Sequence, residues 1–124
     1  MNPKQFLQIG GIILIVVGVL GFFLIGPSAE ESIFGAAWWF DNPENWAHLV
    51  LGIVALLVLY ALPENTHKPV VIAVGAVALL IGLYSLFGET TLLGANLENP
   101  LDTLLHVAVG AWALWAGLKG QVQV

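Results

Sequence analysis

The chain has 124 residues, of which 59% are hydrophobic and 9% are charged, and its formal net charge is −5 at pH 7. A soluble domain has about 25% charged residues, so most of this chain's surface is expected to meet lipid rather than water. Three lysines without an arginine cannot neutralise a phosphate backbone, which excludes nucleic-acid binding. The absence of cysteine excludes disulfides, thiolate metal sites and thiol chemistry.

The first predicted element is an apolar run from Phe6 to Ile25 that only Gln8 interrupts. As a helix it is roughly 30 Å long, which matches the hydrocarbon core of a bilayer. It ends at Gly26-Pro27. A cleaved signal peptide is the alternative, but the run is too long for its apolar region and no small-x-small site follows. We therefore predict a retained membrane span.

Three further spans are predicted along the chain, over residues 42–62, 69–88 and 99–118. Asn42-Pro43 and Asn99-Pro100 each predict an N-cap followed by proline at the first helical position. All the runs are continuously apolar rather than alternating, which excludes a β-barrel pattern. The predicted fold is an all-α, polytopic membrane protein, with residues 1–124 forming a single domain of four transmembrane helices.

The charges predict an orientation. Lys4, Lys68 and Lys119 all fall on one side of a four-span arrangement, together with Glu64. The positive-inside rule makes this side cytoplasmic. We predict a multi-pass protein of the cell (inner) membrane with both termini in the cytoplasm. The acidic loops 27–42 and 88–99 are then on the outer side.

Aromatic residues gather in and just after the first outer loop. Such residues are typical of the headgroup layer, where an amphipathic ring keeps one edge in water. We interpret this segment as a short re-entrant or interfacial anchor rather than a binding site. The predicted interfacial aromatics are Phe34, Trp38, Trp39, Phe40 and Trp46.

The second half of the sequence repeats features of the first. ENWAHLVLG, from Glu44 to Gly52, aligns without a gap on DTLLHVAVG, from Asp102 to Gly110. IFGA at 33–36 likewise matches LLGA at 92–95. The shared order predicts duplication of a two-helix unit, with repeats at 6–62 and 69–118. Because two helices return the chain to its starting side, the repeats are expected to be parallel and related by a pseudo-twofold axis along the membrane normal.

Small residues recur on the predicted spans. In lipid, helices associate through close packing, which glycine permits. The predicted packing positions are Gly18, Gly21, Gly52, Gly82, Gly110 and Gly117.

These motifs resemble the small four-helix bacterial membrane proteins catalogued as domain of unknown function 4383. The resemblance rests on VGVLG at 17–21, NWAHLVLG at 45–52 and DTLLHVAVG at 102–110, and covers nearly the whole chain. Two positions depart from the family pattern: Glu44 stands where another histidine is common, and Thr103 replaces an asparagine. The resemblance implies the fold and topology and supplies no activity.

The repeated polar residues form the candidate site. Each histidine lies four residues after an acid and three after Asn or Thr, so these side chains share a helix face and could hydrogen-bond. Three interpretations stay open: hydrogen bonds that tie the repeats, ligation of haem or a divalent metal, and proton transfer. The residues of this constellation are Glu44, Asn45, His48, Asp102, Thr103 and His106.

No other pattern indicates chemistry. Ser85 has no neighbouring base, His67 is interpreted as a solvated loop residue, and no charge lies mid-span as ion-coupled transport would need. We predict a structural or accessory, non-enzymatic membrane protein without a cofactor. Its expected partners are the lipid bilayer and either further copies of itself or a larger membrane complex. The alternative is a protein that binds haem or a divalent metal through His48 and His106.

Overall fold

The computed structural model describes residues 2–87, 91–92, 95–96 and 100–118, and within them the fold is four long helices. All four are long and apolar enough to cross a membrane, which confirms the prediction of four long apolar helices. Short 3₁₀ turns lie in the first and second connections, and two-residue strands pair antiparallel in the third. The elements are α1 (Pro3–Phe23), η1 (Gly35–Ala37), α2 (Asn42–Ala61), η2 (Glu64–Thr66), α3 (His67–Leu86), β1 (Thr91–Leu92), β2 (Ala95–Asn96) and α4 (Pro100–Leu118).

Side-chain caps fix where the first two helices begin. The Asn2 side chain accepts a hydrogen bond from the backbone N–H of Gln5 at 2.8 Å, and the Asn2 backbone N–H donates to Oε1 of Gln5 at 3.0 Å, which makes a capping box. In α2 the cap is Asp41, whose carboxylate accepts from the Glu44 N–H at 3.0 Å. The predicted cap, Asn42, is therefore wrong by one residue, since Asn42 already has helical backbone geometry. The other predicted cap, Asn99, lies outside the described residues.

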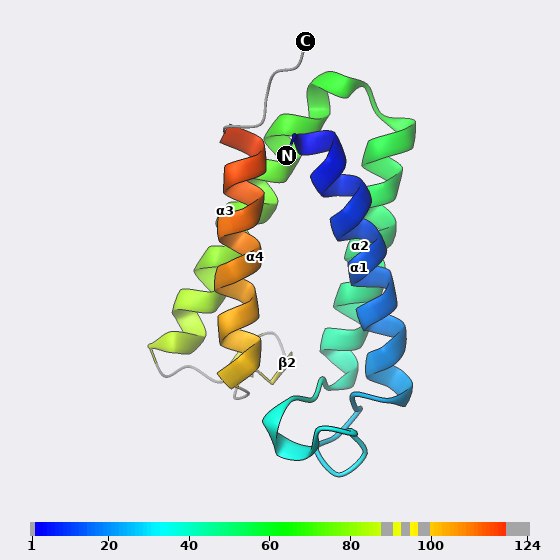
Figure 1. The fold of residues 1–124 in the computed structure, drawn as a ribbon, viewed down its shortest axis with the longest axis vertical. Coiled ribbons are helices and arrows are strands. Elements are labelled where there is room, and N and C mark those ends of the chain that lie inside the picture. The colour runs from blue at the N-terminus through cyan, green and yellow to red at the C-terminus, as the bar shows by residue number, and fades with distance from the viewer. Residues whose placement is uncertain (1, 88–90, 93–94, 97–99, 119–124) are drawn as a thin grey trace.

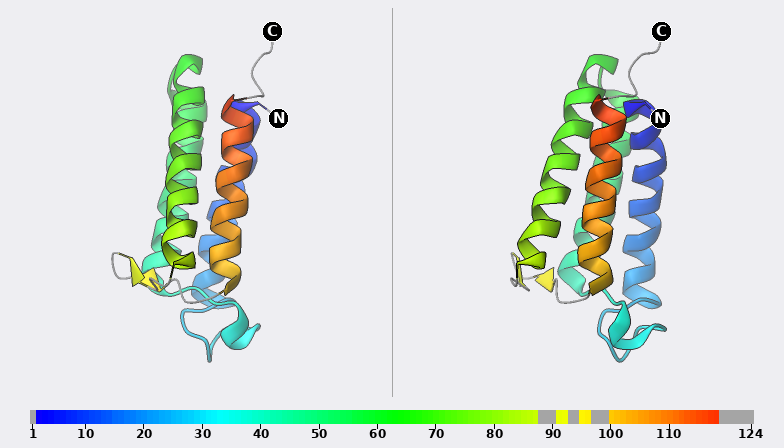
Figure 2. Two further views of the ribbon diagram at one scale, coloured as in Figure 1. Left: turned by 90° about the vertical axis from the view of Figure 1, so that its left-hand side faces the viewer. Right: turned by 60° about the vertical axis from the view of Figure 1, so that its left-hand side comes forward.

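The helices form two antiparallel hairpins, α1 with α2 and α3 with α4 (Figure 1). Contacts within each hairpin are extensive, whereas those between the hairpins are sparse. The ends of α1 and α4 that lead to the two termini are at the same end of the bundle, as Figure 2 shows from two further directions. We call this the terminal end, and the opposite end, which carries the loop Leu24–Asp41, the loop end.

Close backbone approach holds each hairpin together, and all six glycines predicted for packing face a neighbouring helix. A Cβ placed on Gly52 would lie 2.8 Å from the carbonyl oxygen of Gly11. In the second hairpin, a Cβ on Gly110 would lie 2.7 Å from the backbone nitrogen of Leu79 and 3.0 Å from the oxygen of Gly75. Real Cβ contacts are longer than this, so the helices could not stay this close with larger residues.

An apolar core joins the hairpins at the terminal end. Phe6 packs edge-on against Trp112 of α4, with ring centroids 4.6 Å apart. The outward faces of all four helices carry large exposed aliphatic and aromatic side chains, as expected for contact with lipid. The buried core residues are Phe6, Leu7, Val58, Leu59, Val71, Ala113 and Ala116.

His67 differs from its prediction as a solvated loop residue, because it is buried at the start of α3. Its Nε2 lies 3.2 Å from the carbonyl oxygen of Val58 in the last turn of α2. A carbonyl only accepts, so Nε2 carries the proton and donates. The bond satisfies a carbonyl that the helix end would leave unpaired, and it ties α3 to α2.

The described charges are sorted between the ends of the bundle. Lys4, Lys68 and Glu64 lie at the terminal end, where the Lys4 and Glu64 side chains form an exposed ion pair at 4.0 Å. The third lysine, Lys119, is outside the described residues, as are Glu89 and Glu98 in the predicted outer loop 88–99. The predicted assignment of the terminal end to the cytoplasm stays a prediction.

Candidate functional site

Four ionisable side chains gather at the loop end, on the first two turns of α2 and α4. Glu44 and His48 come from α2, and Asp102 and His106 come from α4. We call these four residues the acid–histidine cluster. Both carboxyl groups are buried, with Glu44 5% and Asp102 1% exposed. Burial of an ionisable group at membrane depth costs free energy unless it has a partner, so such groups are candidates for function.

The two acids interact electrostatically across the hairpins. Asp102 is an electrostatic neighbour of Glu44, and Asp41 is an electrostatic neighbour of both. Among the residues that the structure describes, no hydrogen-bond donor reaches either oxygen of Glu44 or Oδ2 of Asp102. The sequence places Glu44 beside His48, whereas in the structure one of its acidic neighbours, Asp102, comes from the other hairpin. Residues 58 positions apart are thereby brought together.

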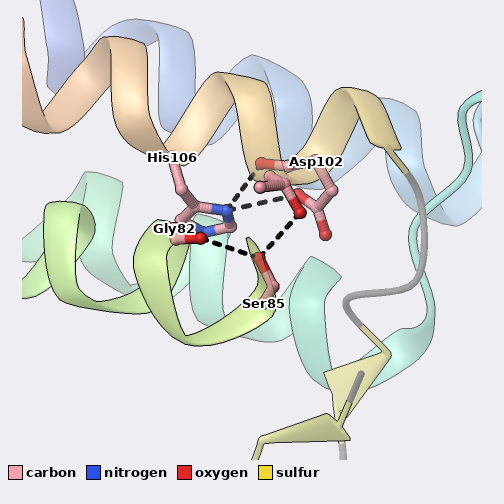
Figure 3. A network of polar contacts seen from close by, with 5 residues as sticks. Gly82, Ser85, Asp102 and His106 are labelled. Carbon is pink, nitrogen blue, oxygen red and sulfur yellow. Dashed lines mark hydrogen bonds and ion pairs between the residues drawn. The ribbon is translucent and has the colours of Figure 1, made fainter. Parts of the chain in front are cut away.

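His106 is oriented by the first turn of its own helix (Figure 3). Its Nδ1 lies 2.9 Å from the backbone oxygen of Asp102 and 3.5 Å from the carboxylate oxygen Oδ1 of the same residue. Since a carbonyl only accepts, Nδ1 carries a proton, and a neutral His106 then has its lone pair on Nε2. The predicted pairing of this histidine with its acid is present.

His48 has different surroundings. Its ring meets the Phe40 ring edge-on, with centroids 5.1 Å apart and an interplanar angle of 78°. Its buried Nδ1 has no hydrogen-bond partner among the described residues, and His48 interacts electrostatically with His106. The expectation that the two repeated histidines make equivalent bonds therefore holds only for His106.

Asn45 and Thr103 do not serve their histidines as predicted. The Asn45 side chain is fully buried over Gly21 of α1, where any Cβ would overlap it, and its amide makes no hydrogen bond. Thr103 instead contacts Ser85 of α3, with hydroxyl oxygens 2.7 Å apart. Ser85 donates to the carbonyl of Gly82 at 3.1 Å, so Thr103 is the donor to Ser85 (Figure 3).

Sequence reasoning missed the role of Ser85, which it examined as a nucleophile without a base. The position of Ser85 in the sequence could have indicated this role. Ser85 stands three residues after Gly82, so it shares the helix face on which that predicted packing glycine contacts α4. A hydroxyl on that face is available to a polar residue of the partner helix.

The loop Leu24–Asp41 folds back over the cluster. The Phe40 N–H donates to the carbonyl of Ile25 at 2.8 Å, and Gly26, at φ 149°, gives the chain room beside the Phe40 carbonyl. Phe40 is thereby buried between Trp38 and His48. This differs from its predicted place among the interfacial aromatics, because it fills space inside the protein.

The remaining predicted interfacial aromatics are more accessible. Phe34 and Trp46 are exposed, and Trp38 and Trp39 are half-buried. The Trp46 ring packs edge-on against Phe22, with centroids 5.2 Å apart. These rings form a rim around the loop end.

The arrangement of possible metal ligands bears on the alternative that the chain binds a divalent metal. Across residues 2–87, 91–92, 95–96 and 100–118, no three His, Cys, Asp or Glu side chains are arranged to hold one metal ion. The cluster brings two carboxyls and two imidazoles near one another, and the ion pair within it joins His106 to Asp102 at 3.5 Å.

Comparison with known proteins adds no assignment: no family model, no curated protein and no solved structure matches the chain. The resemblance to domain of unknown function 4383 therefore stays a prediction.

Proposed function

We propose that this chain is a non-enzymatic, accessory membrane protein whose two hairpins are copies of one unit and are locked together by the acid–histidine cluster. The observation that carries the proposal is the electrostatic interaction between the buried side chains of Glu44 and Asp102. These residues occupy the same position in the two aligned motifs, so duplication would bring a pair of like residues to the axis between the copies.

Matching contacts inside the hairpins support the duplication. In the first hairpin, a Cβ on Gly18 would meet the backbone of Leu49, and in the second, a Cβ on Gly82 would meet the backbone of Val107. Leu49 and Val107 each follow the repeated histidine directly. The Gly52 contact with Gly11 corresponds in the same way to the contact of Gly110 with Gly75.

The acid–histidine cluster complements the apolar core. Phe6 and Trp112 join the hairpins at the terminal end, and the acid–histidine cluster joins them at the loop end. Hydrogen bonds between membrane helices contribute about 0.6 kcal/mol on average. A few such contacts therefore fix the position of one hairpin relative to the other more than they raise the free energy of unfolding. The apolar outer faces are then free to contact lipid, further copies of the chain or a larger membrane complex.

A double-mutant cycle tests whether Glu44 and Asp102 hold the two hairpins together. Glu44→Ala, Asp102→Ala and the double variant are unfolded in mixed micelles, and their free energies of unfolding are compared with that of the unsubstituted protein. Residues in contact are expected to couple by about 0.5 to 3 kcal/mol. The matched control pairs Asp102→Ala with Glu31→Ala, because Glu31 is an exposed acid of the loop. Additive effects for Glu44 with Asp102 would contradict the lock.

The cofactor alternative keeps one supporting observation, the unpartnered buried Nδ1 of His48 close to His106. Absorption spectra and metal analysis of protein purified from its native membrane distinguish the two proposals. A Soret band or stoichiometric metal that is lost on His48→Ala or His106→Ala would favour the cofactor function. The structural proposal expects neither signal.

A further inference from the structure

We propose that the outward faces of the four helices fit a thin bilayer, with a hydrocarbon core of about 21 to 26 Å, and that lipids with short acyl chains are their preferred partners. A typical hydrocarbon core is about 30 Å thick. Such a preference rests on the proposed function only in that the chain is a membrane protein. It depends on the surface of the bundle and not on the contacts between the hairpins.

The outward face of α2 has an amphipathic aromatic residue near each end. Trp46 is 58% exposed and Tyr60 is 72% exposed. They are 14 residues apart, so they lie about 21 Å apart along the helix and about 40° apart around it, on one face. The exposed side chains between them on this face are the aliphatic Val50, Ile53 and Leu57. Because Trp and Tyr are typical of the headgroup layer, the pair marks the two limits of an apolar band about 21 Å high.

The outward face of α1 has an apolar band of the same height. Near the terminal end, the exposed Gln8 places an amide on this helix. The exposed apolar side chains begin at the next residue, Ile9, and continue to Phe23, the last residue of the helix. Ile9 and Phe23 are 14 residues apart, which again corresponds to about 21 Å. An amide that loses its hydrogen bonds to water costs free energy, so Gln8 is expected in the headgroup layer rather than in hydrocarbon.

The second hairpin has bands of similar height. On α3 the exposed large apolar side chains run from Val74 to Phe87, the residue that follows the helix, over about 20 Å. On α4 they begin at Leu101 and reach Trp115 after 14 residues, which is about 21 Å. Trp115 lies near the terminal end of its helix, as Tyr60 does in α2. Each hairpin therefore has an exposed amphipathic ring near the terminal end.

Exposed leucines extend these bands slightly. Leu24 and Leu62 follow the last residues of α1 and α2, and Leu118 ends α4. The longest band, over residues 101–118, is then about 26 Å high, and any tilt of the helices lowers its height along the membrane normal. In a core of about 30 Å, either the polar groups of Gln8 and Tyr60 enter hydrocarbon or the bilayer becomes thinner around the protein. Both cost free energy, so lipids with short acyl chains are expected to bind more tightly.

Lipid competition at the protein surface tests this preference in the full chain. The protein is reconstituted with dimyristoleoyl, dioleoyl or dierucoyl phosphatidylcholine, each mixed with brominated dioleoyl phosphatidylcholine. Quenching of tryptophan fluorescence, to which the exposed Trp46 and Trp115 contribute, then gives the relative binding constant of each lipid. We expect the binding constant to be highest for the dimyristoleoyl lipid and about two-fold or more lower for the dierucoyl lipid. A binding constant that is highest for either longer lipid, or equal for all three, would overturn the inference.

A double variant, Gln8→Leu with Tyr60→Leu, extends the apolar bands of α1 and α2 at the terminal end. We expect it to bind the dioleoyl lipid more tightly, relative to the dimyristoleoyl lipid, than the unsubstituted protein does. The control, Ile12→Leu with Leu57→Ile, changes exposed residues inside the same bands and should leave this ratio unchanged. An unchanged ratio in the double variant would contradict the assigned limits. Tryptophans that brominated lipid does not quench would also overturn the inference, since a second copy would then cover these faces. No outcome depends on the coupling between Glu44 and Asp102, so this preference and the proposed function can fail separately.

Discussion

The glycine contacts yield a matched pair of substitutions, Gly110→Ala and Gly10→Ala. An added Cβ at Gly110 would lie 2.7 Å from the nitrogen of Leu79 and 3.0 Å from the oxygen of Gly75, against 3.4–4 Å for an ordinary contact. Both neighbours are backbone atoms, so α3 and α4 must separate. At Gly10 the nearest atoms belong to the Phe6 ring, at 3.7 Å, which leaves room for the methyl group.

The magnitude follows from two opposing effects. Replacing glycine by alanine within a helix stabilises it by about 0.5 to 1 kcal/mol, and both positions are helical. Overpacking against atoms that cannot rotate away costs about 1 to 3 kcal/mol. We therefore expect Gly110→Ala to lower the free energy of unfolding by about 1 to 2 kcal/mol, and Gly10→Ala to leave it unchanged or raise it by up to about 1 kcal/mol.

Reversible unfolding in mixed micelles with increasing SDS, followed by tryptophan fluorescence, measures both variants. Gly52→Ala provides the same test in the first hairpin, because its Cβ would meet the backbone of Gly11 and Ile15. If Gly110→Ala and Gly52→Ala are tolerated as well as Gly10→Ala, the hairpins are not held by close backbone contact and the packing argument is wrong.

Two further predictions concern topology and the α2–α3 connection. A single cysteine at Ser28 should react with an impermeant thiol reagent added to intact cells, and one at Asn65 should not, since the lysines predict that the terminal end is inside. The reverse labelling pattern would overturn this orientation. His67→Ala should lower the free energy of unfolding by about 1 to 3 kcal/mol, because it leaves the Val58 carbonyl unpaired. His67→Gln retains a donor, so it should lower the free energy of unfolding by less. Equal decreases for the two variants in the same unfolding assay would show that the hydrogen bond does not stabilise the protein.

The sequence was sufficient to predict the helices because each is a continuous apolar run bounded by proline, glycine or a capping residue. The second span begins at Asn42 and the fourth ends at Leu118 in both the prediction and the structure, and the other ends that lie within the described chain differ by one to three residues. The packing glycines were also accessible to sequence reasoning, because a residue without a side chain on an apolar helix permits close approach.

The partner of Glu44 could not be predicted in this way. Helical spacing relates a residue only to neighbours on its own helix, and it therefore pairs Glu44 with His48. The interaction with Asp102 depends on the position of one hairpin relative to the other, which is set partly by the apolar core some turns away. Equivalent residues of a repeat meet only when the axis between the copies passes near them.

Phe40 and His67 were misplaced for a related reason. Both lie in connections, where a polar or aromatic residue is usually assigned to water or to the membrane interface. The short turn after α2 returns the chain onto the end of that helix, where an unpaired carbonyl accepts from His67. The longer first loop places Phe40 inward through its backbone bond to Ile25.

The interaction between Glu44 and Asp102 has a consequence for biosynthesis. The first hairpin leaves the ribosome before α4 has been made, so it enters the membrane with an acid whose eventual neighbour does not yet exist. During this interval, Glu44 must keep contact with water or headgroups, which its place near the start of α2 allows. Insertion of the second hairpin then brings Asp102 to Glu44. A chain truncated after α3 would therefore lack the Asp102 neighbour of Glu44.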